Sequence, residues 1–598
     1  MTQSDHFLQR TPDRGAFPFP VEWIDDQPWK VEESLARMSP EEQAQWALRL
    51  RGKQRQDFLV LSPCAAEVIR HFPPEEVYQM VKETGEADAL PVLSIATAGQ
   101  LQYLFDLEWW FQDKFNPERA LHWIEILDHC GEPQMVHWLL NEEEFEQKVV
   151  LLQSLTRIYK RDELTDTCEG VEGLPHFTLD GVYDIFCKIS DFEPLRRLLL
   201  QLRDADASLY MALMEAVIWY PVTPTVENAL RWHLARTAER GIPSFEEALE
   251  IYSRFDSEVL KTAVPSADDF QSSETEQVPP SFPLMDSAPD TFFRRCVQNL
   301  ERLERMNSLQ WELTYLANKI LVADRCDPAS LDARRAAVRK MLGYVNIGLE
   351  SGAEGDVFKG TRLLEQTWMQ ALFQAGYGQV QRLRWAAQTL VKEHGKLFEF
   401  LLAPGDREQM MALLARFPRI GTFANQGEPL LWRDLESLAD IHILQAFLAR
   451  WKFFARFSRL CLDLTETRAK NFLQESISGP DGEVDIVLWT NTAWARFILF
   501  KEISCQPLAD SAAQNFLKRV FLPPLIPGDG REINEEWVEG FRQKLISGGT
   551  MAWTAEDREF LAGLIDSCRS NVMSQFSRLN PGTTIDWQFT HGLVIAKA

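Results

Sequence analysis

The sequence predicts a mainly α protein: an N-terminal superhelix of short helices followed by further helical domains. Three observations support this fold class. Helix-start signals recur along the chain, as at 39–42, 116–119 and 244–247. Apolar residues follow these signals at the three- and four-residue spacing of an amphipathic helix. The connections between apolar runs are short and contain Gly, Pro, Asp or Asn, so we expect consecutive helices to pack on each other.

The helix-start signals have a physical basis. Ser39, Asn116 and Ser244 can each accept a hydrogen bond from a first-turn N–H group that has no partner within the helix. Pro40 and Pro117 follow at the one position that needs no N–H donor. Glutamates in the first turn favour the positive end of the helix dipole. We therefore expect helices to begin at these positions.

The N-terminal part of the chain divides into a lead-in and a superhelix. Residues 1–30 are polar and rich in Pro, so we expect an extended segment. The superhelical domain is predicted at 31–160, and an acidic, Gly-containing stretch at 160–176 ends it. Its clearest helical segments are 75–84, 98–105, 117–127, 134–140 and 142–158. The starts are irregularly spaced, which does not fit a repeat family of fixed period.

The rest of the chain is predicted to be helical on both sides of a linker. A second helical block is expected at 177–261, and residues 262–288 have the Pro-, Ser- and acid-rich composition of a disordered linker. A C-terminal helical domain is expected at 289–598, with a tail at 583–595 that alternates in part and leaves room for a few short strands. The clearest helices of these two parts are 191–202, 207–219, 292–321, 328–350, 357–375, 380–393, 441–464, 508–519 and 555–578.

Composition and charge restrict the classes of function. The chain has 598 residues and a net charge of -26, which argues against general nucleic-acid binding because phosphate neutralisation needs an excess of Lys and Arg. We find no apolar run of membrane-spanning length, and the N-terminus lacks the features of a signal peptide. The nine cysteines are dispersed, which suits a reducing compartment. We therefore expect a cytoplasmic protein with no membrane span.

Common catalytic and nucleotide-binding motifs are missing from the sequence. The Gly-Lys pairs at 52–53 and 395–396 are not followed by Ser or Thr, so neither ends a phosphate-binding loop. The Gly-Tyr-Gly string at 376–378 lacks the third glycine of a dinucleotide-binding motif. Glu75 and Glu76 resemble paired catalytic carboxylates, but we interpret them as acidic residues of a helix first turn. No cofactor is expected.

Three histidines are the best candidates for metal ligands. His122 and His129 would lie two turns apart on one helix, and His137 follows after a short turn. Imidazole pairs on one face can bind zinc or other transition metals. His122 and His137 lie between apolar neighbours, however, which is typical of partly buried, hydrogen-bonded histidines. We favour that structural interpretation over a metal site.

Two aromatic segments are candidates for partner binding. Trp109 and Trp110 form a dense aromatic pair, and Trp is enriched at interface hot spots as well as in protein cores. The segment 444–464 interleaves aromatic residues with four basic ones, which could contact an acidic partner, a membrane surface or single-stranded nucleic acid. These four are Arg450, Lys452, Arg456 and Arg459. For both segments we favour packing inside the protein. Large aromatic residues dominate cores as readily as interfaces, and in 444–464 the Arg stems can cover apolar neighbours while their charged ends reach water.

The sequence resembles an uncharacterised family of large, helical, cytosolic bacterial proteins. The resemblance covers most of the chain and rests on the segments 72–78, 88–90, 100–107, 116–121, 177–181, 245–249 and 346–350. It implies no activity, because none is established for that family. The N-terminal helices are also distantly similar in style to the acidic superhelical cytosolic domain of bacterial magnesium channels, although this sequence has no membrane pore to gate.

The sequence by itself does not assign a function. The leading hypothesis is a cytosolic scaffold that binds another protein, because stacked helices present extended surfaces and no catalytic constellation emerges. Two alternatives stay open. One is an enzyme whose active site is assembled from residues far apart in the sequence, and the other is a sensor of divalent metal ions.

Overall fold

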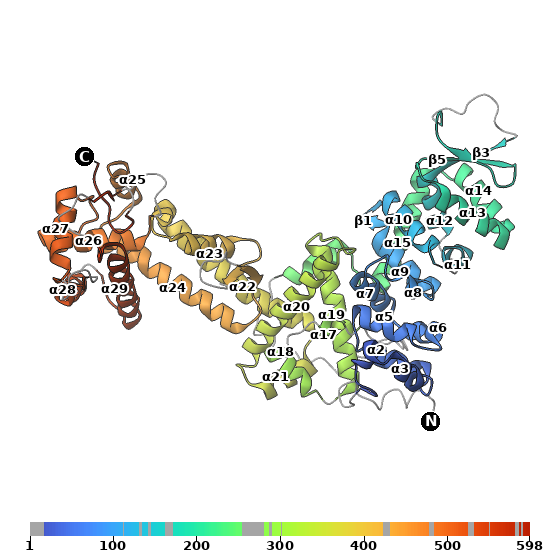
Figure 1. Ribbon diagram of the computed structural model, residues 1–598, viewed down its shortest axis with the longest axis horizontal. Helices are drawn as coiled ribbons and strands as arrows, with labels where there is room; N and C mark the ends of the chain where they lie inside the picture. Colours follow the sequence, from blue (N-terminus) through green and yellow to red (C-terminus); the bar gives the residue numbers. More distant parts are fainter. Residues whose placement is uncertain are drawn as a thin grey trace. The chain divides into compact units, whose positions relative to one another are not determined.

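The structure is a computed structural model of the whole chain (Figure 1). It describes residues 17–111, 113–130, 134–141, 145–161, 171–253, 280, 282–285, 290–300, 302–422, 431–477, 484–523, 531–548, 551–579, 585–587 and 590–597. The protein is mainly α, as the sequence predicts. Its contacts divide it into two compact units, Met1–Gly376 and Tyr377–Ala598.

The first unit contains most of the short helices. Up to Leu155 these are α2 (Trp23–Asp26), α3 (Pro28–Leu35), α4 (Pro40–Ala47), α5 (Gly52–Val60), α6 (Ala65–Val68), η1 (Ile69–His71), α7 (Pro74–Thr84), α8 (Leu90–Leu93), α9 (Ala98–Glu108), α10 (Pro117–Asp128), α11 (Gln134–Leu140) and α12 (Phe145–Leu155). After a small sheet follow α13 (Glu193–Ala205), α14 (Ala207–Trp219), α15 (Val222–Glu239), α16 (Phe245–Leu249), η3 (Glu250–Tyr252), α17 (Phe282–Met285), α18 (Phe292–Gln298), α19 (Leu303–Ala323), α20 (Leu331–Gly352) and α21 (Val357–Gln366). The long helix α22 (Met369–His394) contains the boundary between the units.

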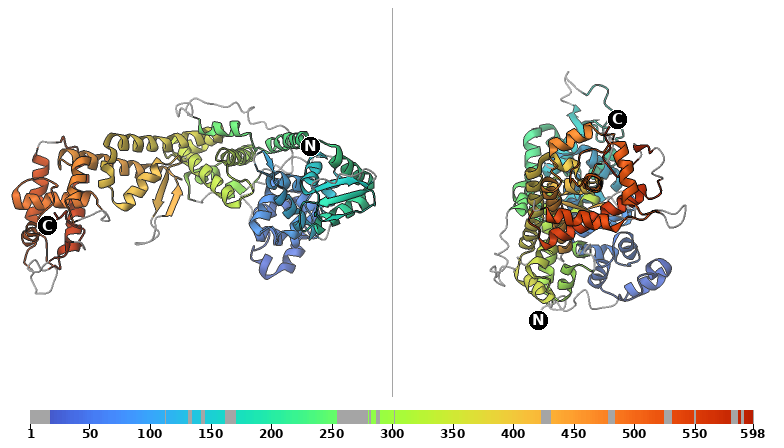
Figure 2. Two further views of the ribbon diagram at one scale, coloured as in Figure 1. Left: turned by 90° about the horizontal axis from the view of Figure 1, so that it is seen from above. Right: turned by 90° about the vertical axis from the view of Figure 1, so that its left-hand side faces the viewer.

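Two small antiparallel sheets interrupt the helices of the first unit. β1 (Trp110–Phe111) pairs with β2 (Lys114–Phe115) directly before α10. The second sheet has the order β3-β5-β4, formed by β3 (Thr156–Lys160), β4 (His176–Phe177) and β5 (Tyr183–Cys187). Figure 2 shows this sheet in turquoise, beside the helices of the same colour. The central strand β5 is buried at Tyr183, Ile185 and Cys187, so the sheet contributes to the core.

The helix starts expected from the sequence are confirmed. Ser39 and Glu42 form a reciprocal capping box at α4. The Asn116 side chain accepts from the Arg119 N–H at 3.1 Å at α10, and Ser244 caps α16 through the Glu247 N–H. Each cap satisfies a donor that the helix itself leaves unpaired. Local chemistry therefore determines where these helices begin.

Several helix predictions are wrong in extent. The helix expected at 142–158 ends at Leu155, because the chain turns into strand β3 and pairs with β5. The helix expected at 292–321 is divided into α18 and α19. The helix expected at 357–375 is interrupted at 367–368, between α21 and α22, whereas the break expected between 375 and 380 does not occur and α22 continues through Gly376 and Gly378. Pairing and packing with distant residues override the local pattern in these places.

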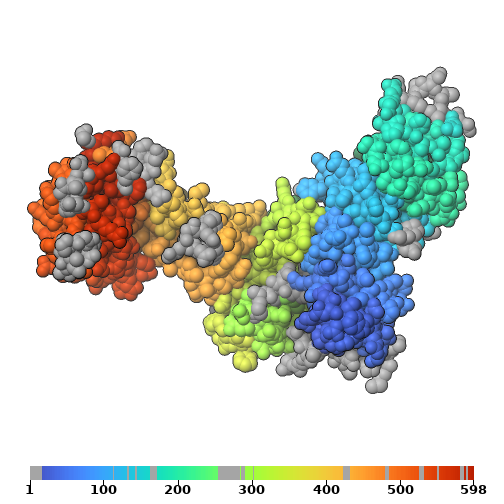
Figure 3. Space-filling view, viewed as in Figure 1, coloured from blue at the N-terminus to red at the C-terminus, as the bar shows by residue number. Residues whose placement is uncertain are grey.

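A hydrophobic core joins the helices of the N-terminal part of the first unit. It runs from Phe19 to Ala229 in the sequence and includes the fully buried rings of Trp109, Trp123 and Trp138. Contacts join α5 to α7, α7 to α9, α12 to α15 and α13 to α14, so neighbours in space are mostly near neighbours in the chain. Figure 3 shows the blue and turquoise segments closely packed on the face in view.

The second unit is also helical, with one hairpin. After the last part of α22 it contains η6 (Gly395–Phe400), α23 (Pro404–Leu414), β6 (Arg419–Thr422), β7 (Leu431–Asp434), α24 (Leu438–Leu460), α25 (Glu466–Gln474), α26 (Ile486–Phe500), α27 (Asp510–Val520), α28 (Glu535–Ser547) and α29 (Ala555–Phe576). β6 and β7 pair antiparallel. Near the C-terminus, where short strands were expected, isolated bridges join Ala596 to Ser476 and Ile595 to Leu508.

The expected domain bounds stay a prediction. Most of the linker expected at 262–288 lies outside the described residues, as do the lead-in before residue 17 and Glu142 to Glu144. The extended conformation expected for the lead-in is wrong where the structure describes it, because α2 and the start of α3 lie before residue 31, and the described part of the linker contains α17. The helices after that linker, as far as Gly376, belong to the first unit. Among the described residues, none of the helices combines the length and the apolar character that crossing a bilayer requires.

Candidate functional site

The two tryptophans proposed for partner binding lie in the core. Trp109 is fully buried and stacks on Phe105, with ring centroids 4.0 Å apart. Trp110 is also buried, and its ring stacks on His233 at 5.1 Å. Burial leaves neither ring available to a partner in this structure. The sequence pattern was compatible with a position in the core and with one at a partner interface, because aromatic residues dominate cores as readily as interfaces.

The basic residues of α24 lie in the second unit and are divided between ion pairs and solvent. Arg450 donates to Asp406 at 3.0 Å, and Arg456 pairs with Asp557. Lys452 and Arg459 are exposed. The aromatic residues between them, including Trp451, are mostly buried. The helix therefore packs its rings inward, and a partner role for its four basic residues stays a prediction.

The three candidate metal ligands make separate contacts. His122 lies 2.7 Å from a carboxylate oxygen of Glu86, through Nε2. His129 Nδ1 lies 2.7 Å from the Glu125 carbonyl oxygen, and His137 is exposed. In the part of the chain that the structure describes, no three His, Cys, Asp or Glu side chains form a group that could hold a metal ion.

Helix α10 takes part in a buried charged network on the side that faces α7 and α9. The Glu108 side chain is fully buried at the end of α9 and accepts hydrogen bonds on both carboxylate oxygens. Tyr78 donates to it at 2.8 Å and Lys82 at 3.1 Å. From α10, Arg119 pairs with the same carboxylate and Trp123 Nε1 donates at 3.1 Å. A buried carboxylate with four donors fixes α10 relative to α7 and α9.

A second carboxylate extends this network toward solvent. Glu86 lies 2.6 Å from Lys82 Nζ, 3.1 Å from Arg119 and 2.7 Å from His122. Burial alone would raise the pKa of Glu86, but the hydrogen bonds and the positive charge of Lys82 hold this pKa at about 2. Glu86 and Glu108 therefore share Lys82 and Arg119, and the charges of the network balance.

The lowered pKa of Glu86 predicts a loss of stability in acid. The unfolded chain binds a proton near the ordinary pKa of about 4.5, whereas the folded chain resists it down to about 2. The contribution of Glu86 to the free energy of unfolding is thus present above pH 4.5 and is lost as the pH falls toward 2. We expect Glu86→Gln to lower the melting temperature at pH 7 and to have a much smaller effect at pH 3, measured by circular dichroism. An equal effect at both pH values would contradict this.

The acidic pair of Glu75 and Glu76 at the start of α7 lies in the helix first turn, as expected, but its side chains are buried and not exposed to solvent. Glu76 pairs with the buried Arg55 at 2.6 Å. Burial raises the pKa of Glu75, and its two carboxylate oxygens have no hydrogen-bond partner. The sequence contains no signal that separates such buried acids from ordinary first-turn acids.

The side of α10 that faces α11, α12 and α13 lines two hollows. Leu121, Ile124 and Asp128 follow each other at helical spacing, so they lie along one stripe of the helix. Leu121 lines one hollow, and Ile124 and Asp128 line the other. The side that faces α7 and α9 meanwhile carries Arg119 and Trp123 of the network. One helix thus makes a buried ion-pair network with α7 and α9 on one side and borders two hollows on the side that faces α11, α12 and α13.

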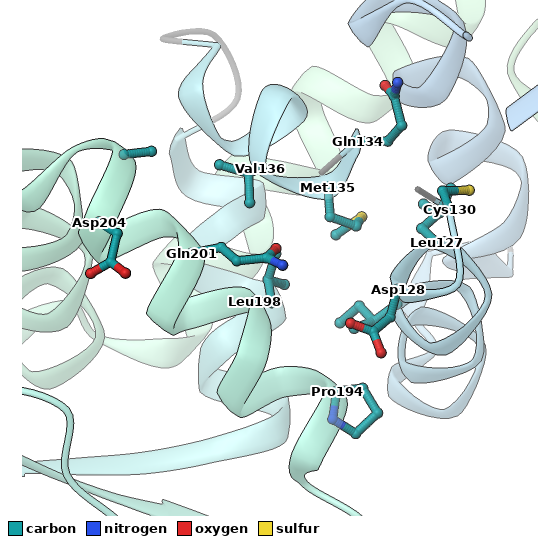
Figure 4. Close-up of a pocket in the computed structure, with 12 residues that line it drawn as sticks. Leu127, Asp128, Cys130, Gln134, Met135, Val136, Pro194, Leu198, Gln201 and Asp204 are labelled. Atoms are coloured by element: carbon teal, nitrogen blue, oxygen red, sulfur yellow. The ribbon is translucent and has the colours of Figure 1, made fainter. Parts of the chain in front are cut away.

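The first hollow lies between α10, α11 and α13 and has a volume of about 370 Å³ (Figure 4). Figure 4 shows Asp128 from α10, Met135 from α11 and Gln201 from α13 around a common space. The lining is mainly apolar, with polar groups added by Asp128, Gln134, Gln201 and Asp204, and the apolar members include Ile124, Leu127, Met135, Val136, Pro194 and Leu198.

Two features of this hollow limit its chemistry. Arg197 of α13 pairs with Asp128, its Nε lying 3.1 Å from Oδ2, which ties α13 to α10. Burial raises the pKa of the Cys130 thiol to about 11, so the thiol stays protonated and is a poor nucleophile. The hollow is therefore suited to accept apolar groups and not to nucleophilic catalysis at Cys130.

The second hollow lies at the N-terminal end of α10 and has a volume of about 560 Å³. Residues of strands β1 and β2, of the end of α12 and of the segment after β5 complete its walls. Lys114 and Lys188 supply its basic groups, and Phe111, Phe115 and Leu155 are among its apolar ones. Sequence reasoning missed both hollows, because each combines residues from segments that are far apart in the chain.

Comparison with known proteins identifies the family. The model of a family of unknown function, DUF6178, matches residues 32–596, which is nearly the whole chain and includes α10 and both hollows. The chain belongs to this family. No curated protein and no solved structure matches the chain. Membership of a family of unknown function agrees with the resemblance seen in the sequence and assigns no activity, while a bacterial origin and the similarity to magnesium channels stay predictions.

Proposed function

We propose that this member of the DUF6178 family is a cytoplasmic scaffold that binds another protein at the hollow between α10, α11 and α13. The observation that carries the proposal is the mainly apolar hollow between α10, α11 and α13. Interfaces concentrate binding energy in a few apolar or aromatic side chains that enter such pockets. A hollow of about 370 Å³ is large enough to take one or two anchoring side chains of a partner segment.

Rigidity of the binding helix supports this proposal. The network of Glu108, Arg119 and Trp123 fixes the side of α10 that faces α7 and α9, and the Arg197–Asp128 pair ties the helix to α13. A surface held in this way loses little conformational freedom when a partner binds, so less binding energy is spent on ordering it.

Cysteine chemistry supports the cytoplasmic location. The cysteines among the described residues are all free thiols, and Cys187, Cys296, Cys505 and Cys568 are buried. Secreted proteins of oxidising compartments commonly use their cysteines in disulfides, whereas cytosolic proteins keep them reduced.

The proposal predicts a partner that contacts the first hollow. A photo-crosslinking residue at Gln201, which is exposed beside the hollow, is expected to capture one protein in the native cells. The same residue at the exposed Glu227 of α15, which does not line the hollow, serves as the control. Identical cross-linked proteins at both positions, or none at Gln201, would contradict the proposal.

Reconstitution with the purified partner then tests the hollow itself. Gln201→Trp is expected to fill the hollow and weaken binding by about tenfold or more, since it removes the space for an anchoring side chain. Gln201→Ala keeps the hollow open and should bind within about threefold of the unmodified protein. Isothermal titration calorimetry measures both affinities, and equal affinities of the Trp and Ala variants would reject this site.

A further inference from the structure

The second hollow, at the N-terminal end of α10, has a chemistry of its own. Its floor is apolar: Leu155 is buried, and Phe115, Leu121 and Ile189 are partly buried around it. Phe111 stands at its rim with 45% of its surface exposed, although it is a large aromatic residue. A volume of about 560 Å³ lies within the range of small-molecule pockets.

The charged groups of this hollow are mainly positive. Lys188 Nζ donates to the Gln153 carbonyl oxygen at 2.5 Å, which uses one of its three protons and leaves two for a ligand. Burial lowers the pKa of Lys188, and the positive charge of Arg157 lowers it further. The side chain of Lys114 makes no hydrogen bond or ion pair with the residues that the structure describes. Glu118 is the one acidic residue in the lining.

The surroundings strengthen this positive potential. The hollow includes the N-cap Asn116 and Pro117, the first residue of the twelve-residue helix α10, where the helix dipole places partial positive charge. The positive charge of Arg157 also acts on the Lys188 amine and, after burial, contributes to lowering its pKa. An anion bound between the lysines would offset this positive charge, so the energetic gain from a negative ligand is larger here than at an isolated lysine.

We propose that this hollow is a binding site for a small organic acid, with its carboxylate between Lys114 and Lys188 and its apolar or aromatic body against Phe111, Phe115 and Leu155. The site stands independently of the proposed protein partner, because it uses a different hollow and different residues.

A matched pair of ligands tests the chemistry of the site. Naphthalene-2-carboxylate and naphthalene-2-carboxamide share the ring but differ in charge. Isothermal titration calorimetry with the full chain is expected to show binding of the carboxylate, and about tenfold weaker binding of the amide, because charge-assisted hydrogen bonds to the lysines are lost. The affinity of the carboxylate should also fall as salt is raised. Equal affinity for the two ligands, or no binding of either, would overturn the proposal.

Variants then locate the site. Lys114→Met removes an exposed cation without disturbing a structural contact, and we expect it to weaken carboxylate binding severalfold while leaving amide binding unchanged. Lys188→Met should weaken carboxylate binding further, and its melting temperature shows whether the lost bond to Gln153 affects folding. Lys53→Met on α5 is the control, because Lys53 is exposed and does not line the hollow. Full carboxylate affinity in Lys114→Met, or an equal loss in Lys53→Met, would reject this location.

Discussion

Gly348→Ala is expected to destabilise the first unit by about 3 kcal/mol, because two helix backbones meet at this glycine. A Cβ atom at Gly348 in α20 would clash with the Leu372 carbonyl oxygen and lie 2.9 Å from the Gly376 nitrogen in α22. The contact is mutual, since a Cβ at Gly376 would clash with the Tyr344 carbonyl oxygen. Backbone atoms cannot rotate away as a side chain can, so the helices would have to separate.

The same helix provides a control for this prediction. Gly378 lies two residues further along α22, and a Cβ there would meet nothing within 4 Å. Gly378→Ala should be neutral or stabilise by about 0.5–1 kcal/mol, because alanine is the better helix former. Urea unfolding followed by circular dichroism measures both variants. Similar stabilities for the Gly348 and Gly378 variants would show that the close approach does not occur.

Glu108→Ala is expected to cost about 3–5 kcal/mol of stability, because it leaves a buried charged network without its central carboxylate. Lys82 and Arg119 would then share Glu86 alone, and Tyr78 and Trp123 would lose their acceptor. An exposed acid on α10, Glu118, is the matched control, and Glu118→Ala should change stability by less than about 0.5 kcal/mol.

A double-mutant cycle separates the ion pair from simple loss of packing. The effects of Glu108→Ala and Arg119→Met should be strongly non-additive, because both changes remove the same contact. Thermal or urea unfolding of the two single variants and the double variant gives the coupling free energy. Additive effects would mean that the two side chains do not interact, and would remove the argument that this network holds α10 rigid.

Helix starts were predictable because their causes are local. Ser39, Asn116 and Ser244 cap helices with residues three positions away, so a short stretch of sequence contains the whole interaction. The end of α12 was not predictable in this way. Residues 156–160 continue an apolar pattern that favours a helix, but their strand pairing is with 183–187, a segment that only the folded chain brings beside them.

For the candidate site, too, some features were predictable from the sequence and others depended on contacts between distant segments. The sequence marks Trp109 and Trp110 as notable, but it cannot tell an interface from a core, and the structure places both in the core. The hollows have no sequence signal, since α10 and α13 bring together residues about seventy positions apart. The histidines of α10 were recognisable as a pair, whereas the contact of His122 with Glu86 was not.

The sequence by itself determined the helical class, most helix starts, the acidic charge and the absence of familiar catalytic motifs, because these follow from composition and from contacts within one turn of helix. Only the tertiary structure decided which charges are buried, where α20 and α22 approach closely, and which face of α10 is hollow. Those properties depend on pairs of segments distant in the chain, and one residue pattern is compatible with several such pairings until packing selects one.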